Sequence, residues 1–287
     1  MSMDPLVTAL LDLTHELPGL PKPLLIGGGF GLYLKQRDLE DRDIQTLIPG
    51  EFWPPARATE DIDLLLPVEI IISRADMQAL RNALDRLGYV SDVDFLQFTR
   101  QTPMGPVKVD FLTGDIPRQH RSKVKISRPR VRPKGGVRLH AYLTPEALAL
   151  ESHSLELTLR GVRSNGEPSD VRVCIPNPFT YLLMKLHAFR DRADDEQKQL
   201  ARHHSLDVFR IVAMLTRPEF DLVKSLRDIH AAAGPVTAAS GIVQESFADG
   251  NHLGVLRLRA ELASAGVDAS HVPIDAFVSA ITALFPP

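Results

Sequence analysis

Hydrophobic positions change their period along the chain, and this change separates a strand-rich first part from a helical second part. Up to about residue 175, apolar residues alternate with polar ones or form short runs, as at 24–26 and 60–66, which is typical of strands. Beyond it they recur every three or four residues, as expected for packed helices. The pattern predicts an α+β protein, a mixed β-sheet with flanking helices followed by a mainly helical C-terminal region, with domains at 1–175 and 176–287.

Local signals predict where several helices begin. Ser73 and Asp76 have the spacing of a helix cap, and the apolar residues that follow them fall on one helical face. Asn177 followed by Pro178 predicts another helix start. We expect a further helix over 195–216, which stops before a proline.

A hairpin is expected around the turn residues 102–106. The runs at 94–100 and 107–112 have strand character on either side of this Pro- and Gly-containing connection. Asp110 is therefore predicted to lie on a strand beside at least one neighbouring strand.

Three carboxylates stand on predicted strands. Asp61 and Asp63 are two residues apart, so on a strand both side chains leave the same face, and Asp110 lies on the second run. Acidic groups that converge repel one another at low dielectric, and a hard cation with oxygen ligands relieves this repulsion. The pattern predicts Asp61, Asp63 and Asp110 as catalytic, metal-binding residues, with Mg²⁺ or Mn²⁺ as cofactor.

Glycines follow the short strand at 24–26. At a strand-to-helix turn, Gly27, Gly28 and Gly29 would let backbone N–H groups come close to a triphosphate, and the helix N-terminus favours negative charge. We therefore expect these three glycines to bind the nucleotide.

Basic residues are concentrated in one segment, although the net charge is -3. The segment has no acidic residue and nine basic ones: Arg118, Arg121, Lys123, Lys125, Arg128, Arg130, Arg132, Lys134 and Arg138. Such a segment can bind a phosphate backbone, and we predict Arg128, Arg130 and Arg132 as nucleic-acid-binding residues. A solvated strand face is the alternative. Base stacking is not expected, because no aromatic residue interrupts the segment.

Composition places the chain among soluble globular proteins: 44% of its 287 residues are hydrophobic and 24% are charged. The single Cys174 excludes a disulfide within the chain and suits a reducing compartment. No apolar run is long enough to cross a bilayer, and residues 1–20 are too polar for a signal peptide. We expect a cytoplasmic protein with no membrane partner.

Taken in order, these motifs resemble the nucleotidyltransferase superfamily, which includes DNA polymerase beta and the tRNA nucleotidyltransferases. Within it they are most similar to the nucleotidyltransferase toxin of type IV abortive-infection toxin-antitoxin systems (AbiEii-like). The resemblance covers roughly residues 20–217. The matching elements are Gly28-Gly29-Phe30-Gly31-Leu32, Thr59 two residues before Asp61 and Asp63, the third acid Asp110, and Lys185-Leu186-His187-Ala188.

The resemblance implies a nucleotidyltransferase-type mixed sheet and an enzyme that moves a nucleoside monophosphate from an NTP to a hydroxyl acceptor. It also implies RNA, such as a tRNA end, as the acceptor and an antitoxin protein as the partner. It adds Thr59, Lys185 and Asp207 to the nucleotide-binding residues. A solvated surface lysine is the alternative for Lys185.

Two departures from the family pattern affect this assignment. The distance between the glycines and Asp61 predicts an inserted loop at 38–58, and histidines stand before Asp207 where the family has Lys-Asp. A zinc site at these histidines is rejected, because no other histidine pattern supports it. A dinucleotide-binding dehydrogenase is excluded, because the glycine run lacks the third glycine of that fingerprint. A non-catalytic nucleotide- or RNA-binding module that retains the fold stays open.

Overall fold

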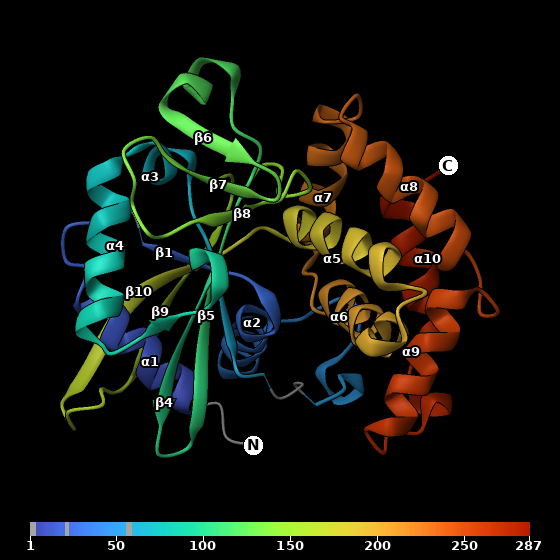
Figure 1. The fold of residues 1–287 in the computed structure, drawn as a ribbon. Helices are drawn as coiled ribbons and strands as arrows, with labels where there is room; N and C mark the ends of the chain where they lie inside the picture. The colour runs from blue at the N-terminus through green and yellow to red at the C-terminus, as the bar shows by residue number, and fades with distance from the viewer. Residues whose placement is uncertain (1–3, 21–22, 56–58) are drawn as a thin grey trace. The chain divides into compact units, whose positions relative to one another are not determined.

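The computed structural model describes residues 4–20, 23–55 and 59–287 (Figure 1). The chain forms two compact units, one made of residues 1–31 and 57–176 and the other of residues 32–56 and 177–287. The described strands all lie in the first unit, and α5 to α10 lie in the second. The predicted α+β class, a mixed sheet with helices and then a mainly helical C-terminal region, is confirmed. The division into a catalytic domain at 1–175 and a helical domain at 176–287 stays a prediction.

Within the described residues, the first unit contains a ten-stranded sheet. Its strands are β1 (Leu24–Ile26), β2 (Asp61–Leu65), β3 (Val90–Ser91), β4 (Gln97–Thr102), β5 (Gly105–Thr113), β6 (Val124–Ser127), β7 (Arg130–Pro133), β8 (Ala141–Leu143), β9 (Leu155–Val162) and β10 (Pro168–Ile175). The main order is β6-β7-β8-β5-β2-β1-β10-β9, while β4 pairs with β5 and β3 with β4. The sheet is mixed, because β2 and β8 both run parallel to β5 and the hairpin strand β4 runs antiparallel to it.

One face of this sheet is apolar. Ile62 and Leu64 of β2 and Val109 and Phe111 of β5 are fully buried on it. Helix α1 (Asp4–His15) contacts β2, β5, β9 and β10. Helix α4 (Arg74–Arg86) joins the same layer, since its Arg86 is bonded to Glu16 at 2.6 Å. The opposite face of β2 and β5 carries their polar residues.

The predicted helix starts are present. Ser73 Oγ accepts the N–H of Asp76 at 3.2 Å where α4 begins, just after α3 (Val68–Ile72). Asn177 Oδ1 accepts the N–H of Thr180 at 2.9 Å where α5 (Pro178–Arg192) begins. The helix that the glycines begin is α2 (Gly28–Asp41).

The single helix expected over 195–216 was wrong in its first part. A 3₁₀ segment, η4 (Glu196–Ala201), precedes α6 (Arg202–Ala213). Ala201 separates them because its φ of 58° is left-handed and interrupts α-helical hydrogen bonding.

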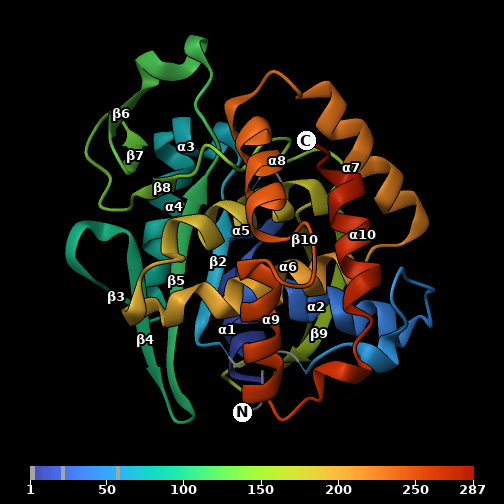
Figure 2. The same ribbon diagram turned by 90° about the vertical axis from the view of Figure 1, so that its right-hand side faces the viewer.

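The second unit is packed around α6, which is buried from His204 to Ala213 and contacts α5, α9 and α10. The helices that follow α6 are α7 (Arg217–Ile229), α8 (Gly234–Ser246), α9 (Leu253–Ser264) and α10 (Ile274–Leu284), and α8 contacts both α9 and α10 (Figure 2). None of the described helices is both long and apolar enough to cross a membrane.

The inserted loop expected at 38–58 belongs to this helical unit as far as it is described. Leu47 N–H donates to Leu215 O at 2.7 Å, and Ile48 N–H donates to Ala213 O at 3.1 Å. Residues 56–58 of that segment lie outside the described residues. The loop is therefore attached to the C-terminal end of α6.

Candidate active site

Strands β2 and β5 bring the three predicted acids together. In their parallel register Asp63 is opposite Asp110, and Asp61 is opposite Lys108. Residues paired in this way place their side chains on the same face, and residues two apart on one strand share it. Asp61, Asp63 and Asp110 therefore share the polar face of the sheet, where each is half-buried.

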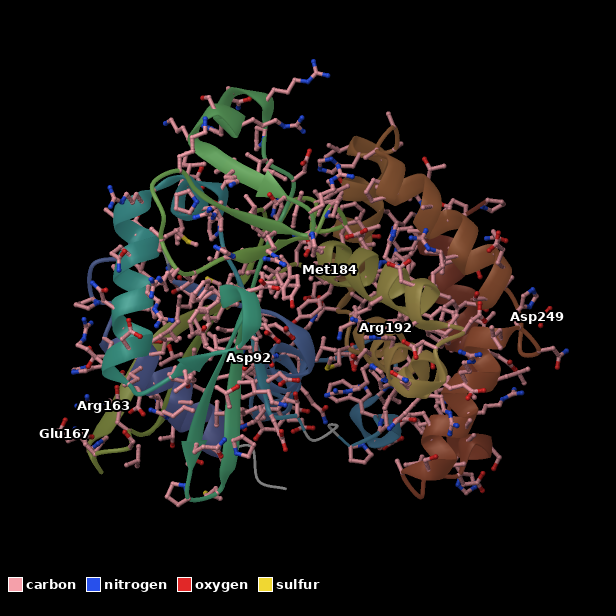
Figure 3. All side chains as sticks on the ribbon, viewed as in Figure 1. Asp92, Arg163, Glu167, Met184, Arg192 and Asp249 are labelled. Atoms are coloured by element: carbon pink, nitrogen blue, oxygen red, sulfur yellow. The ribbon has the colours of Figure 1, made fainter. Side chains whose placement is uncertain are left out.

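The ionisation of Asp110 is strongly perturbed. Burial and then the neighbouring Asp63 carboxylate raise its pKa from 3.8 to about 7, with further increases from Asp61 and Asp92. Asp92 directly follows β3 and is labelled in Figure 3. Gln97 of β4 opposes this shift, because its amide donates to both Asp110 oxygens at 2.9 and 3.0 Å. The acids are thus close enough to disfavour one another's charge.

The glycine turn lies directly against Asp63. Gly27 N–H donates to the Asp63 carbonyl at 2.7 Å. Gly28 has a φ of 61°, and a Cβ on it would lie 1.7 Å from Asp63 Oδ2. Only glycine fits there, and Gly29 follows in the first turn of α2. The N-terminus of α2 is therefore adjacent to the acid cluster.

Thr59 forms a hydrogen bond at the start of β2. Its Oγ1 accepts the N–H of Asp61 at 3.2 Å, two residues along the chain. This bond orders the backbone immediately before Asp61 and Asp63. In the structure Thr59 therefore contacts the acid-bearing strand directly.

The three carboxylates are a candidate metal site. Among residues 4–20, 23–55 and 59–287, no group of three or more His, Cys, Asp or Glu side chains is already arranged to hold a metal ion. The donor set nevertheless suits one, because three carboxylates share a face. Asp61 Oδ1 is shielded from solvent without a hydrogen-bond partner in the described chain, and the Lys108 ammonium lies 4.0 Å from it. Such oxygens are the ligands that Mg²⁺ prefers.

Lys185 and Asp207 lie in the helical unit, and the structure brings them to each other. Lys185 Nζ of α5 is 2.7 Å from Asp207 Oδ2 of α6, and their side chains are 12% and 0% exposed. The solvated-lysine alternative for Lys185 is therefore wrong. Asp207 is the counterion of Lys185, a relation that the sequence motif by itself did not reveal.

The three predicted nucleic-acid-binding arginines have different surroundings. Arg128 is exposed between β6 and β7. Arg130 binds the Asp94 carboxylate through two nitrogens, each at 2.7 Å. Arg132 of β7 is opposite Lys125 of β6.

Sequence reasoning missed two residues beside the acids. Gln97 was inside a predicted strand, but its contact with Asp110 depends on the hairpin register. Tyr142 of β8 is paired with Leu112 of β5, and its pKa is raised by burial and then by the Asp110 carboxylate. No local signal distinguishes either residue, because both act across strands.

Comparisons with known proteins add two remote structural likenesses. No protein-family model matches the chain, and no curated protein matches it. It is similar to an antigenic nucleotidyltransferase-like protein from Paracoccidioides brasiliensis, with 18% identity, a TM-score of 0.45, and coverage of 95% of this chain and 98% of that one. It is also similar to the antibiotic-resistance factor ANT(2'')-Ia, with 15% identity, a TM-score of 0.36, and coverage of 80% and 99%. Both TM-scores are below 0.5, and neither likeness carries an argument about fold or activity.

Proposed function

We propose that this chain is a metal-dependent nucleotidyltransferase that moves a nucleoside monophosphate from an NTP to a hydroxyl acceptor. The observation that carries the proposal is the parallel register that sets Asp63 opposite Asp110, with Asp61 on the same face. The glycine turn against Asp63 supports it, because a phosphate site is expected beside the metal ligands. The sequence motifs supply the reaction class.

The three acids are proposed to bind the metal, and Asp110 is also proposed to act as the base. Asp61, Asp63 and Asp110 would hold Mg²⁺ or Mn²⁺, which when bound supplies stabilisation of the charge that develops on the phosphate oxygens. Asp110 is proposed to accept the proton of the attacking hydroxyl, because it is the third acid of the cluster and, without metal, burial and the Asp63 carboxylate raise its pKa to about 7. Gln97 orients the Asp110 carboxylate through its two hydrogen bonds.

Other groups would bind the nucleotide. Backbone N–H groups of Gly28 and Gly29 would contact the triphosphate at the start of α2, and Gly27, whose N–H is bonded to the Asp63 carbonyl, would fix the turn that presents them. Thr59 is proposed as a nucleotide contact next to Asp61, and Lys185 and Asp207 as contacts from the helical unit.

RNA, such as a tRNA end, is the proposed acceptor, and an antitoxin protein is the proposed partner. Both follow from the resemblance to the AbiEii-like toxins. The segment with nine basic residues and no acidic one is consistent with an RNA backbone as ligand.

A transfer assay tests the proposal. The protein is incubated with each labelled NTP, Mg²⁺ and total RNA, and Asp63→Asn serves as the matched variant of unchanged volume. We expect transfer to fall by about 100-fold or more, since a metal contributes several kcal/mol to the transition state. In EDTA the variant should melt at or above the wild-type temperature, because a like charge has been removed. Wild-type rates in Asp63→Asn would refute the assignment.

A non-catalytic nucleotide- or RNA-binding module is the second candidate. Two observations favour it. Both oxygens of the Asp110 carboxylate already accept hydrogen bonds from the Gln97 amide. In the described ranges, no group of three or more His, Cys, Asp or Glu side chains is arranged to hold a metal ion. Calorimetric titration of the protein with nucleotide, in the presence and absence of Mn²⁺, distinguishes the enzyme from the non-catalytic module. A module without catalysis would bind nucleotide equally well with and without Mn²⁺, whereas the enzyme would need the cation.

A further inference from the structure

The polar face that carries the acids continues across the sheet into the β6–β7 hairpin. Asp110 shares its face with Leu112, which is opposite Tyr142 of β8. Tyr142 is in turn opposite Arg130 of β7, and Arg130 is opposite Ser127 of β6. Because paired residues point to the same side, the acids and this basic hairpin share one face of one sheet.

A cavity of about 170 Å³ opens at this hairpin, lined by Lys125, Ser127, Arg130, Arg132 and His140. We call it the hairpin pocket. Its volume is below the roughly 300–1,000 Å³ of sites for drug-sized ligands, so it suits a small group. The side chains of Lys125, Ser127, Arg130 and Arg132 can donate hydrogen bonds to an anion.

The charges of the hairpin pocket are only partly compensated. Asp94 neutralises Arg130 through its two 2.7 Å contacts. Lys125 and Arg132 form no ion pair with any part of the chain that the structure describes. Two cations at one small site therefore stand without a counterion from the protein's described residues.

His140 lines the pocket, and its ring is hydrogen-bonded to the Asp94 backbone. Its ring packs edge-on against Phe95 at 5.7 Å between centroids, which holds it in place. Burial and then the Arg132 guanidinium lower its pKa, in agreement with excess positive charge at this point.

We propose that the hairpin pocket binds a phosphate group of the acceptor molecule. The two uncompensated cations match the charge of a phosphate monoester, and the planar Arg132 guanidinium can bind two of its oxygens. The Ser127 hydroxyl supplies a further hydrogen bond, and the His140 ring forms part of the pocket wall. The acceptor role rests on the proposed nucleotidyl transfer, whereas phosphate binding does not.

Strand order favours the acceptor over the donor as the source of this phosphate. The glycine turn, where the triphosphate is proposed to bind, follows β1 on one side of the acids. The hairpin pocket lies on the other side, beyond β8. With about 4.8 Å between neighbouring strands, β7 is roughly 10 Å from β5, so one acceptor molecule can place a phosphate in the pocket and a hydroxyl at Asp110.

Calorimetry with inorganic phosphate in EDTA tests the pocket itself. Arg132→Gln should weaken phosphate binding at least tenfold, while Arg160→Gln, which removes the same charge from an exposed position of β9 outside the pocket, should change it less than twofold. His140 ring resonances should shift on phosphate addition to the wild type. Equal losses in the two variants, or no binding by a wild type that is folded, would overturn the proposal. Unchanged melting temperatures of both variants establish that they fold.

Transfer kinetics then identify the source of the phosphate. We expect Arg132→Gln to raise KM several-fold for a phosphorylated oligonucleotide acceptor, and to leave KM for a dephosphorylated one and for the NTP unchanged. A raised KM for the NTP would assign the pocket to the donor and overturn the acceptor role. Asp63→Asn should keep wild-type phosphate affinity. Phosphate binding without transfer to any acceptor would therefore reject the proposed enzyme and leave the pocket standing.

Discussion

At the scale of single residues, Gly28 is the position whose side chain is most strictly limited. It combines a left-handed φ of 61° with a carboxylate oxygen where its Cβ would be. Asp63 is the residue that any substitution there would displace. The position of the Asp63 carboxylate in the proposed metal site thus requires that residue 28 has no Cβ atom.

Replacement of Gly28 by alanine should therefore be more costly than a positive φ alone. A left-handed non-glycine residue costs about 1–2 kcal/mol, and this is the loss expected for Gly88→Ala, where φ is 76° and no atom lies within 4 Å of the new Cβ. Gly28→Ala should lose at least about twice as much and also abolish transfer. Urea unfolding of both variants measures the difference. Equal losses would show that Asp63 moves aside freely.

Asp110 makes stability depend on pH in a direction opposite to that of a typical carboxylate. Its pKa is about 7 in the folded protein against 3.8 as the ordinary value. Between these values the folded protein keeps the proton that the unfolded chain releases. The stabilisation is full below pH about 4 and is lost as pH rises towards 7.

The difference between wild type and Asp110→Asn isolates this effect from other groups. In EDTA, the melting temperature of the wild type relative to the variant should fall from pH 4 to pH 7 and then level off. Mg²⁺ at pH 8 should raise the melting temperature of the wild type more than that of the variant. A constant difference across this pH range would contradict the crowding of the acids.

At the scale of elements, one buried ion pair joins α5 to α6. Lys185 and Asp207 are 2.7 Å apart, and Asp207 is fully buried. Breaking such a pair is much more costly than replacing both partners, because a lone charge stays buried.

We expect Lys185→Met to destabilise the protein by about 3–5 kcal/mol, and Lys185→Met with Asp207→Leu to recover most of that loss. Denaturant unfolding of the single and double variants measures both values. The double variant also tests function without the folding defect. If it binds NTP as tightly as the wild type, Lys185 has a structural role and is not a nucleotide contact.

At the scale of the whole molecule, the helical unit is discontinuous in sequence. Residues 32–56 belong to it, although they stand between the glycine turn and the acid-bearing strand β2. Lys35 is bonded to Glu219 of α7 at 2.6 Å, and Leu47 is bonded to Leu215. The sheet unit is thus interrupted by a segment whose packing partners come after residue 176.

A fragment of residues 1–176 should therefore fail to behave as an independent domain. Leu34, Leu39 and Ile48 are at most 4% exposed in the full chain and would lose their neighbours. We expect the fragment to aggregate or to bind a hydrophobic dye, while the full chain remains monodisperse in the same buffer. A monomeric fragment with a cooperative melting transition would contradict this expectation.

The sequence by itself determined features that depend on neighbours a few residues away. The caps at Ser73 and Asn177 involve bonds over three residues, and the common face of Asp61 and Asp63 follows from strand geometry alone. The α+β order of the chain was readable for the same reason, because periodicity is a local property. The break at Ala201 is the exception, as alanine gives no local sign of a left-handed conformation.

Only the tertiary structure decided contacts between residues far apart in the chain. The pairing of Asp63 with Asp110 joins residues 47 positions apart. Arg130 meets Asp94 across 36 positions and Lys185 meets Asp207 across 22, so neither pair leaves a local pattern. The assignment of 32–56 to the helical unit is equally non-local. Such contacts depend on strand order, register and helix packing, which many residues determine jointly, and spacing along the sequence does not encode them.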